Sequence, residues 1–166
     1  TTGIPQYEKM PEYASNLTFE DIRELRKRWR GQLLVKGILR PDDARRAIDA
    51  GADGVVVSNH GGRCLDVAAA PIDVLPRIVD AVGNRAAVLM DGGIRRGSDI
   101  AKAIALGAQG VLSGRPGLFG LSLAGKEGAE HAFKILRSEL LTVMAQLGVN
   151  RIDELGPHLF ERASQA

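Results

Sequence analysis

The segment KGILRPDDARRAIDAGADGVVVS at residues 36–58 recurs as GGIRRGSDIAKAIALGAQGVLSG at residues 92–114. The two copies lie 56 residues apart, and each runs from a glycine turn through a helix-like stretch into an apolar strand. An offset of 56 residues holds two β/α units of about 28 residues each, which is the unit size of a (β/α)8 barrel of about 250 residues. The pairs of identical residues include Gly37/Gly93, Ile38/Ile94, Arg40/Arg96, Asp43/Asp99, Ala47/Ala103, Ile48/Ile104, Gly51/Gly107, Ala52/Ala108, Gly54/Gly110 and Val55/Val111.

Four β/α units are expected around and within this repeat. Strands that are apolar on both faces and alternate with helices indicate a parallel sheet covered by helices. The chain is therefore predicted to be an α/β protein, half of a TIM barrel, with a doubly wound open sheet as the structural alternative. A first helix is expected from Thr18, which forms a capping box with Asp21, to Gly31. Strands are expected at 33–35, 54–57, 86–90 and 110–112, and further helices at 41–51, 71–82, 98–106 and 128–146.

Half a barrel leaves its first and last strands as open edges, and its inner face lacks packing partners. We therefore expect another polypeptide or a second copy to close the sheet. Residues 1–17 are interpreted as an N-terminal arm or loop, and residues 18–166 as the half-barrel. Because the chain begins with Thr1, an upstream segment is also expected.

Composition excludes several classes of protein. The chain has 166 residues, 45% of them hydrophobic and 25% charged, and its net charge of +2 includes no long basic block, so nucleic-acid binding is not indicated. No apolar run approaches the roughly 18 residues of a membrane span, and the N-terminus lacks the pattern of a signal peptide. A single cysteine, Cys64, excludes an internal disulfide and is typical of a reducing compartment. We expect Cys64 to be a small, buried or half-buried residue.

Candidate functional residues follow the predicted strands, where barrels of this kind place their active sites. Lys36 ends the first apolar run; it either extends to solvent at the rim or places a fixed positive charge near a ligand. His60 and Arg63 lie three residues apart in the loop after the second strand. Imidazole accepts and returns a proton near neutral pH, and guanidinium matches a carboxylate. The pair suits a substrate with an acid group beside a reactive carbon.

The third and fourth strands are followed by glycine-rich turns that each contain an arginine, DGGIRRG at residues 91–97 and SGRP at residues 113–116. Glycine lets backbone N–H groups approach an anion closely, although it is also the default residue of any tight turn. Barrels commonly bind phosphate with the loops after strands seven and eight. Two such turns in adjacent units therefore indicate a phosphate site.

Together these motifs carry a family resemblance. VKGI at 35–38, SNHGGRCLD at 58–66, DGGIRRGSD at 91–99 and SGRP at 113–116 resemble the FMN-dependent L-2-hydroxy acid dehydrogenases and oxidases, a family of (β/α)8 barrels that act on lactate, mandelate or glycolate. The resemblance runs from about Thr18 to Ile152 and covers the C-terminal half of the barrel. It implies FMN as cofactor, a small 2-hydroxy acid as substrate, and no metal.

The resemblance also implies a role for each matching residue. Lys36 would lie beside the flavin ring and stabilise its reduced anion, and Ser58 would contact the flavin. His60 would be the active-site base, and Arg63 would bind the substrate carboxylate. The ribityl chain and phosphate of FMN would be held by Asp91, Gly92, Gly93, Arg95, Gly114 and Arg115.

Departures from the family define the alternatives. Cys64 stands where the family usually has glutamine, and the family's tyrosines, second substrate arginine and base-pairing carboxylate belong to a first half that this sequence lacks. The isolated chain could therefore be a non-catalytic FMN- or phosphate-binding half-barrel. A barrel of the IMP dehydrogenase type is disfavoured, because its nucleophilic cysteine follows the phosphate turns whereas Cys64 precedes them.

The resemblance further implies the N-terminal half of the barrel as a partner, on another chain or upstream, and a homo-oligomer of the complete enzyme. A cytoplasmic location is expected, with association at the inner face of the plasma membrane left open. The specific 2-hydroxy acid, the electron acceptor and the choice between carbanion and hydride routes are not decided by the sequence.

Overall fold

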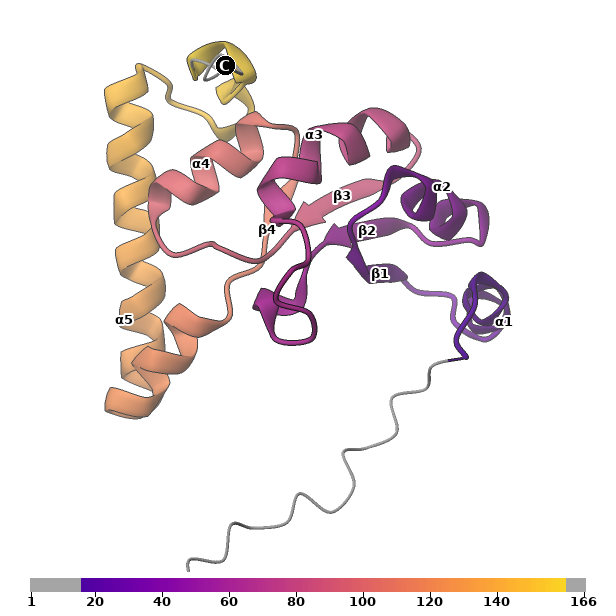
Figure 1. Cartoon of the computed structure of the whole chain (residues 1–166). Coiled ribbons are helices and arrows are strands. Elements are labelled where there is room, and N and C mark those ends of the chain that lie inside the picture. Colours follow the sequence, from indigo (N-terminus) through magenta and orange to yellow (C-terminus); the bar gives the residue numbers. More distant parts are fainter. Residues whose placement is uncertain (1–15, 161–166) are drawn as a thin grey trace, which may run out of the picture.

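The structure, a computed structural model, describes residues 16–160 (Figure 1). The predicted N-terminal arm lies almost entirely outside the described residues. Helices and strands alternate along the rest of the chain, as the repeat predicts. In chain order the elements are α1 (Phe19–Arg28), β1 (Leu34–Ile38), α2 (Pro41–Asp49), β2 (Gly54–Val57), the 3-10 turn η1 (His60–Gly62), α3 (Pro71–Val82), β3 (Ala87–Met90), α4 (Gly97–Ala105), β4 (Gly110–Val111), α5 (Arg115–Leu147), η2 (Ile152–Glu154) and η3 (Pro157–Leu159).

The four strands form one parallel sheet in the order β1-β2-β3-β4. A doubly wound sheet reverses its strand order at a switch point, and this sheet does not reverse. The doubly wound alternative is therefore wrong, and the predicted fold class is confirmed: four β/α units form a partial α/β barrel. The outer strands β1 and β4 each pair on one side within the described residues.

One face of the sheet packs against helices and forms the main core (Figure 1). Val55 and Val57 of β2 and Leu75 and Ile78 of α3 are fully buried. Small side chains on α2 and α4 let those helices approach the strands closely, since alanine leaves the least bulk between backbones. The buried alanines of this cluster are Ala44, Ala47, Ala52, Ala103 and Ala108.

The opposite face carries an aligned row of residues, in which Lys36 pairs with Val56, Val56 with Leu89, and Leu89 with Gly110. This face is less covered than the helix-packed one. Leu34 in β1 remains 43% exposed. The expected open edges and partly unfilled inner face are thus present in the described residues.

The last helix differs from its prediction. It begins at Arg115, not near Gly128, and it is broken at Ala124 and Gly125, whose backbone angles are not helical. The two segments fold back on each other and come into close contact. A Cβ added to Gly120 would lie only 2.2 Å from the Gly128 carbonyl oxygen. Glycines that weaken the helical pattern of 115–123 are thus what allows this close contact.

Two further expectations are corrected. β1 extends to Ile38, so that Lys36 lies inside the strand, because Gly37 with φ 97° absorbs an irregularity in the pairing between Lys36 and Ile38. Cys64 is exposed and not buried, because its loop beyond η1 projects away from the helix-packed core.

Candidate functional site

Lys36 of β1 and the segments that follow β2, β3 and β4 meet in one cleft at the carboxyl end of the sheet, with a volume of about 320 Å³. This convergence follows from the parallel sheet, since parallel strands bring their carboxyl ends to a common edge. Nine of the ten site residues predicted from sequence line the cleft. They are Lys36, His60, Arg63, Asp91, Gly92, Gly93, Arg95, Gly114 and Arg115.

The tenth residue, Ser58, lies just beneath the cleft and is 1% exposed. Its Oγ accepts a hydrogen bond from Lys36 Nζ at 3.0 Å and another from the His60 backbone N–H at 3.1 Å. Ser58 therefore connects the cation of β1 to the histidine of the next unit. Burial of this hydroxyl is tolerated because both of its lone pairs are used.

Lys36 is held in place from two sides. In addition to its bond with Ser58, its Nζ forms an ion pair of 2.8 Å with Asp91 Oδ2. The side chain of Lys36 is 40% exposed and that of Asp91 is 18% exposed. The other oxygen of Asp91, Oδ1, is buried and has no hydrogen-bond partner within the described part of the chain. A buried carboxylate oxygen without a partner is energetically costly, so this atom marks a place where a donor fits.

His60 has φ 55° and is the sole non-glycine residue with a positive φ between residues 16 and 160. Its imidazole lies over Gly37 of β1, where a Cβ would come within 2.8 Å of Nε2. Gly37 thus contributes to the site by having no side chain. Its φ of 97° is a second reason for glycine there.

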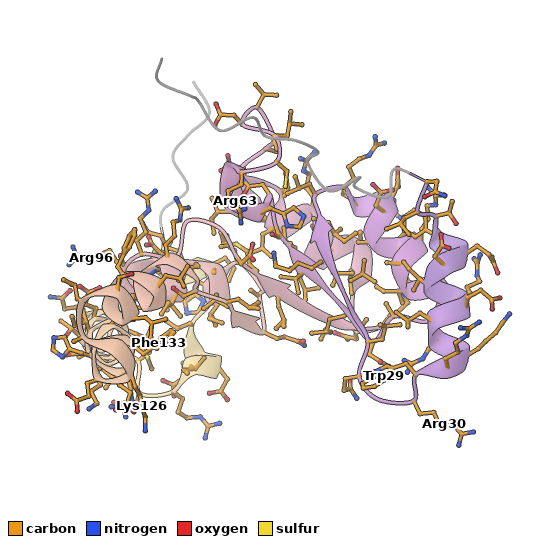
Figure 2. All side chains as sticks on the ribbon, turned by 90° about the horizontal axis from the view of Figure 1, so that it is seen from below. Trp29, Arg30, Arg63, Arg96, Lys126 and Phe133 are labelled. Atoms are coloured by element: carbon orange, nitrogen blue, oxygen red, sulfur yellow. The ribbon has the colours of Figure 1, made fainter. Side chains whose placement is uncertain are left out.

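The two neighbouring arginines of the third loop have different surroundings. Arg95 lines the cleft, whereas the Nε of Arg96 donates to Glu139 Oε1 of α5 at 2.8 Å. Figure 2 shows Arg96 at the start of α4 and Arg63 on the loop beyond η1, both distant from Trp29 and Arg30, which follow the end of α1. The family resemblance selected Arg95 and not Arg96 for the cofactor site, and Arg95 is the one of the two that lines the cleft.

The amino end of α4 is closed by the protein's own carboxylates. Asp99 Oδ2 accepts the N–H groups of Arg95 and Arg96, at 3.0 and 2.9 Å. Glu139 Oε2 accepts the N–H of Gly97 at 2.8 Å. The Gly97 N–H, followed by the Arg96 guanidinium, holds the pKa of the Glu139 carboxyl below its ordinary value of 4.5.

The amino end of α5 is different, because no side chain caps it. Its N-cap residue is Gly114, and a Cβ added there would meet nothing within 4 Å. The Arg115 guanidinium reaches toward η1, since its Nη2 lies 3.6 Å from the position of a Gly61 Cβ. The open amino end of α5 shares the cleft with Arg95 and Arg115, which makes it a favourable place for an anion.

Sequence reasoning missed the apolar part of the lining, which is contributed by Ile94, Leu112, Pro116 and Leu118. These residues adjoin the recognised motifs, so their positions next to the strand ends were the available signal. Within residues 16–160 no cluster of three His, Cys, Asp or Glu side chains is arranged to hold a metal ion. No helix in the same range has the length and apolarity that crossing a membrane requires.

Comparison with known proteins agrees with this geometry. The family model for FMN-dependent dehydrogenases matches residues 5–162. An L-lactate oxidase of Nostoc sp. is 51% identical over 139 residues, which make up 84% of this chain and 38% of that protein. A pre-mycofactocin synthase of Mycolicibacterium smegmatis is 49% identical over 140 residues, or 84% of this chain and 35% of that protein.

Among solved structures, a soluble mutant of the membrane-associated (S)-mandelate dehydrogenase from Pseudomonas putida matches with a TM-score of 0.85 at 44% identity. The match covers 89% of this chain and 42% of that one. The chain thus spans between 35% and 42% of the length of these three proteins. Since the family match runs through nearly all of its residues, the chain belongs to the family of FMN-dependent dehydrogenases.

Proposed function

We propose that this chain is the C-terminal part of an FMN-dependent enzyme that oxidises an L-2-hydroxy acid of the lactate or mandelate class to the 2-oxo acid. The observation that carries the proposal is the convergence of Lys36, His60 and Arg63 with two glycine turns on one cleft. Relatives named L-lactate oxidase and (S)-mandelate dehydrogenase support this class of substrate.

The residues of the cleft fit FMN. The buried Oδ1 of Asp91, which has no partner in the described part of the chain, is suited to accept a hydrogen bond from a hydroxyl group of the ribityl chain. Gly92 and Gly93 have φ values of 83° and 82°, in the left-handed region that favours glycine, so no side chain stands on this turn. A Cβ on Gly93 would meet nothing within 4 Å, so the turn faces open space where a ligand can lie against backbone. We assign Asp91, Gly92 and Gly93 to the ribityl chain.

The phosphate is assigned to Arg95, Gly114 and Arg115. At α4 the N–H groups of Arg95, Arg96 and Gly97 already bind carboxylates, so a phosphate there would have to displace two anions. At α5 no side chain competes for the helix end. The difference between these two amino ends therefore favours the start of α5.

Ser58 and Lys36 are assigned to the flavin ring. Ser58 uses its oxygen lone pairs on Lys36 and on the His60 N–H, which leaves its own hydroxyl hydrogen available to a ring acceptor. Lys36 provides a positive charge whose position is defined by Asp91 and Ser58. A cation held this way stabilises negative charge without having to reorganise.

Bound FMN would supply the two-electron acceptor of the reaction. In our proposal the Arg63 guanidinium binds the substrate carboxylate through paired hydrogen bonds. His60 accepts a proton from the substrate, a task for which imidazole is suited near neutral pH. The substrate loses two electrons and two protons and leaves as the 2-oxo acid: His60 takes one proton and returns it to solvent, and the two electrons and the other proton would pass to the bound FMN.

The complete enzyme requires strands that this chain does not contain. We propose that residues 18–166 form one structural unit whose open strands β1 and β4 pair with the N-terminal half of the barrel. We further propose a homo-oligomer of the closed barrel, located in the cytoplasm. Association with the inner face of the plasma membrane is supported by the membrane-associated mandelate dehydrogenase relative; fractionation of cells into membrane and soluble protein tests it.

The catalytic proposal is tested by adding the missing half. The chain is co-expressed with the preceding segment of the Nostoc relative, FMN is added, and flavin absorbance is followed without oxygen after addition of L-lactate or (S)-mandelate. Bleaching is expected, and it should be lost in His60→Ala but not in His131→Ala, a matched change of an exposed histidine on α5. Unchanged bleaching in His60→Ala would remove the base from the mechanism.

A second candidate function is FMN binding without turnover by the chain alone. It is favoured by the open sheet, because Leu34 of β1 and Leu112, which follows β4, remain 43% and 41% exposed. The purified 166-residue chain is titrated with FMN and then with substrate. Flavin binding with no bleaching supports this candidate, and bleaching by the chain alone contradicts it.

A further inference from the structure

The backbone of the histidine loop has an unusual conformation at His60. His60 has φ 55°, a region that non-glycine residues rarely occupy. Gly61 and Gly62 follow with φ values of 72° and 78°, so three consecutive residues are left-handed. The two glycines adopt such angles freely, whereas the positive φ of His60 persists only when surrounding contacts hold it.

Asn59 makes the contacts that hold this loop. Its Oδ1 accepts the Gly61 N–H at 3.0 Å and thus closes a turn around His60. Its Nδ2 donates to the Ala69 carbonyl oxygen at 3.4 Å, which connects the loop to the segment before α3. Asn59 is half-buried, as expected for a side chain that links two segments.

The same side chain also contacts the third loop. A Cβ on Gly92 would lie 3.1 Å from Asn59 Oδ1 and 3.1 Å from Pro71 Cγ. The Asn59 Oδ1 therefore lies against the Gly92 backbone, next to the start of α3. The side chain joins the loop that carries His60 to the turn assigned above to FMN.

The resulting position of the imidazole is narrowly defined. On one side Ser58 Oγ accepts the His60 N–H, and below the ring Gly37 leaves room for Nε2. Relaxation of the loop toward ordinary backbone angles would rotate the His60 side chain away from Gly37. The Gly61 N–H donates to Asn59 Oδ1. Among the turn and loop hydrogen bonds of residues 16–160, this N–H has no backbone acceptor.

We propose that Asn59 is a positioning residue: by binding the Gly61 N–H and packing on Gly92, it holds the His60 imidazole over Gly37 in the orientation that the reaction needs. This inference rests on the proposed function for the part that concerns catalysis. It extends that function to a residue that is not among those lining the cleft.

The geometric part is tested on the 166-residue chain by NMR. The ring atoms Cε1 and Cδ2 of His60 would lie 3.5 and 3.8 Å from a Cβ on Gly37, so a Gly37 Hα is close enough to give a nuclear Overhauser effect (NOE) to the ring protons. This NOE is expected in the native chain and in Asn84→Ala, which changes an exposed asparagine. It should disappear in Asn59→Ala and return in Asn59→Asp, which keeps an oxygen acceptor for Gly61.

The catalytic part is tested on the co-expressed assembly. Because a misplacement of about 1 Å can cost roughly 100-fold in rate, we expect kcat to fall about 100-fold in Asn59→Ala, with KM and the Kd for FMN changed little. Asn59→Asp should recover most of kcat. A role in stability alone would instead reduce FMN binding and kcat together and would leave the NOE intact.

The outcomes separate this inference from the proposed function. If the NOE persists in Asn59→Ala, or if kcat is unchanged while His60→Ala is inactive, the positioning role is wrong. If Asn59→Ala does not fold, as judged by circular dichroism, a folded Asn59→Asp without the NOE overturns the inference equally well. If His60→Ala bleaches normally, the base assignment fails, while the NOE still decides the geometry.

Discussion

Two adjacent arginines in the third loop provide a sharp test of the cofactor assignment. Arg95 lines the cleft, whereas Arg96 is bound to Glu139 of α5 at 2.8 Å. Arg95→Gln and Arg96→Gln each remove one positive charge, one residue apart, and keep a polar side chain. A general electrostatic effect would weaken anion binding similarly in both, and a direct contact with phosphate would weaken it only in Arg95→Gln.

The expected magnitude follows from the type of contact. A hydrogen bond to a charged group contributes about 1.5–3 kcal/mol. Arg95 is an exposed residue, so water screens its charge and the lower end of this range applies. About 1.4 kcal/mol corresponds to a tenfold change in Kd. We therefore expect Arg95→Gln to raise the Kd for FMN roughly tenfold, and Arg96→Gln to leave it nearly unchanged.

The assay is a fluorescence titration of the chain with FMN and, in parallel, with riboflavin, which has the same ring and ribityl chain but no phosphate. Arg95→Gln should weaken FMN and leave riboflavin unaffected. The reasoning is refuted if both ligands weaken equally in Arg95→Gln, because the loss would then not involve phosphate. It is also refuted if Arg96→Gln weakens FMN as much as Arg95→Gln does.

Three further predictions concern stability and accessibility. Leu75→Ala, at a fully buried position, should lower the free energy of unfolding by about 2–5 kcal/mol in urea titrations. The control Leu123→Ala, at a position that is 87% exposed, should change this free energy by less than about 0.5 kcal/mol. Equal losses in the two variants would contradict the described core. The pKa of the Glu139 carboxyl is lowered in the folded chain, so its contribution to folding stability is complete above the ordinary value of 4.5 and is lost as pH falls through that value and then the folded pKa. Urea midpoints measured between neutral and acid pH should therefore fall less steeply with pH in Glu139→Gln than in the native chain. Parallel curves for the two proteins would count against this role of Glu139. Cys64 is exposed, so a thiol reagent should modify the native chain as quickly as the denatured one, and slow modification would show that the loop is covered.

Much of the fold could be predicted because local signals and the repeat agree. The helix at Pro71–Val82 was placed at its observed bounds from its initial proline and apolar spacing. The sequence was less informative where a residue's conformation depends on a distant partner. The end of β1 at Ile38 depends on an irregularity opposite β2, and the start of α5 at Arg115 depends on the contact between Gly120 and Gly128.

The site was predictable in its residues but not in its connections. Three of the four motifs follow strands and the first includes the end of β1, and parallel strands carry such ends to one edge, so convergence followed from the topology. Nothing in the spacing of the motifs shows that Ser58 bonds to Lys36, that Arg96 faces Glu139, or that Asn59 lies against Gly92. The roles of individual residues remain proposals, to be decided by the variants described above.

By itself the sequence determined the number of β/α units, their order and the four motifs that hold the candidate site residues, because hydrophobic periodicity, helix starts and glycine turns are local properties and the repeat multiplies them. Only the tertiary structure decided which side chains touch, which helix end stays open, and that Cys64 is exposed. Those outcomes depend on contacts between residues far apart in the chain, such as Gly97 with Glu139. Distances across a fold are fixed by packing, and packing leaves no periodic trace in the sequence.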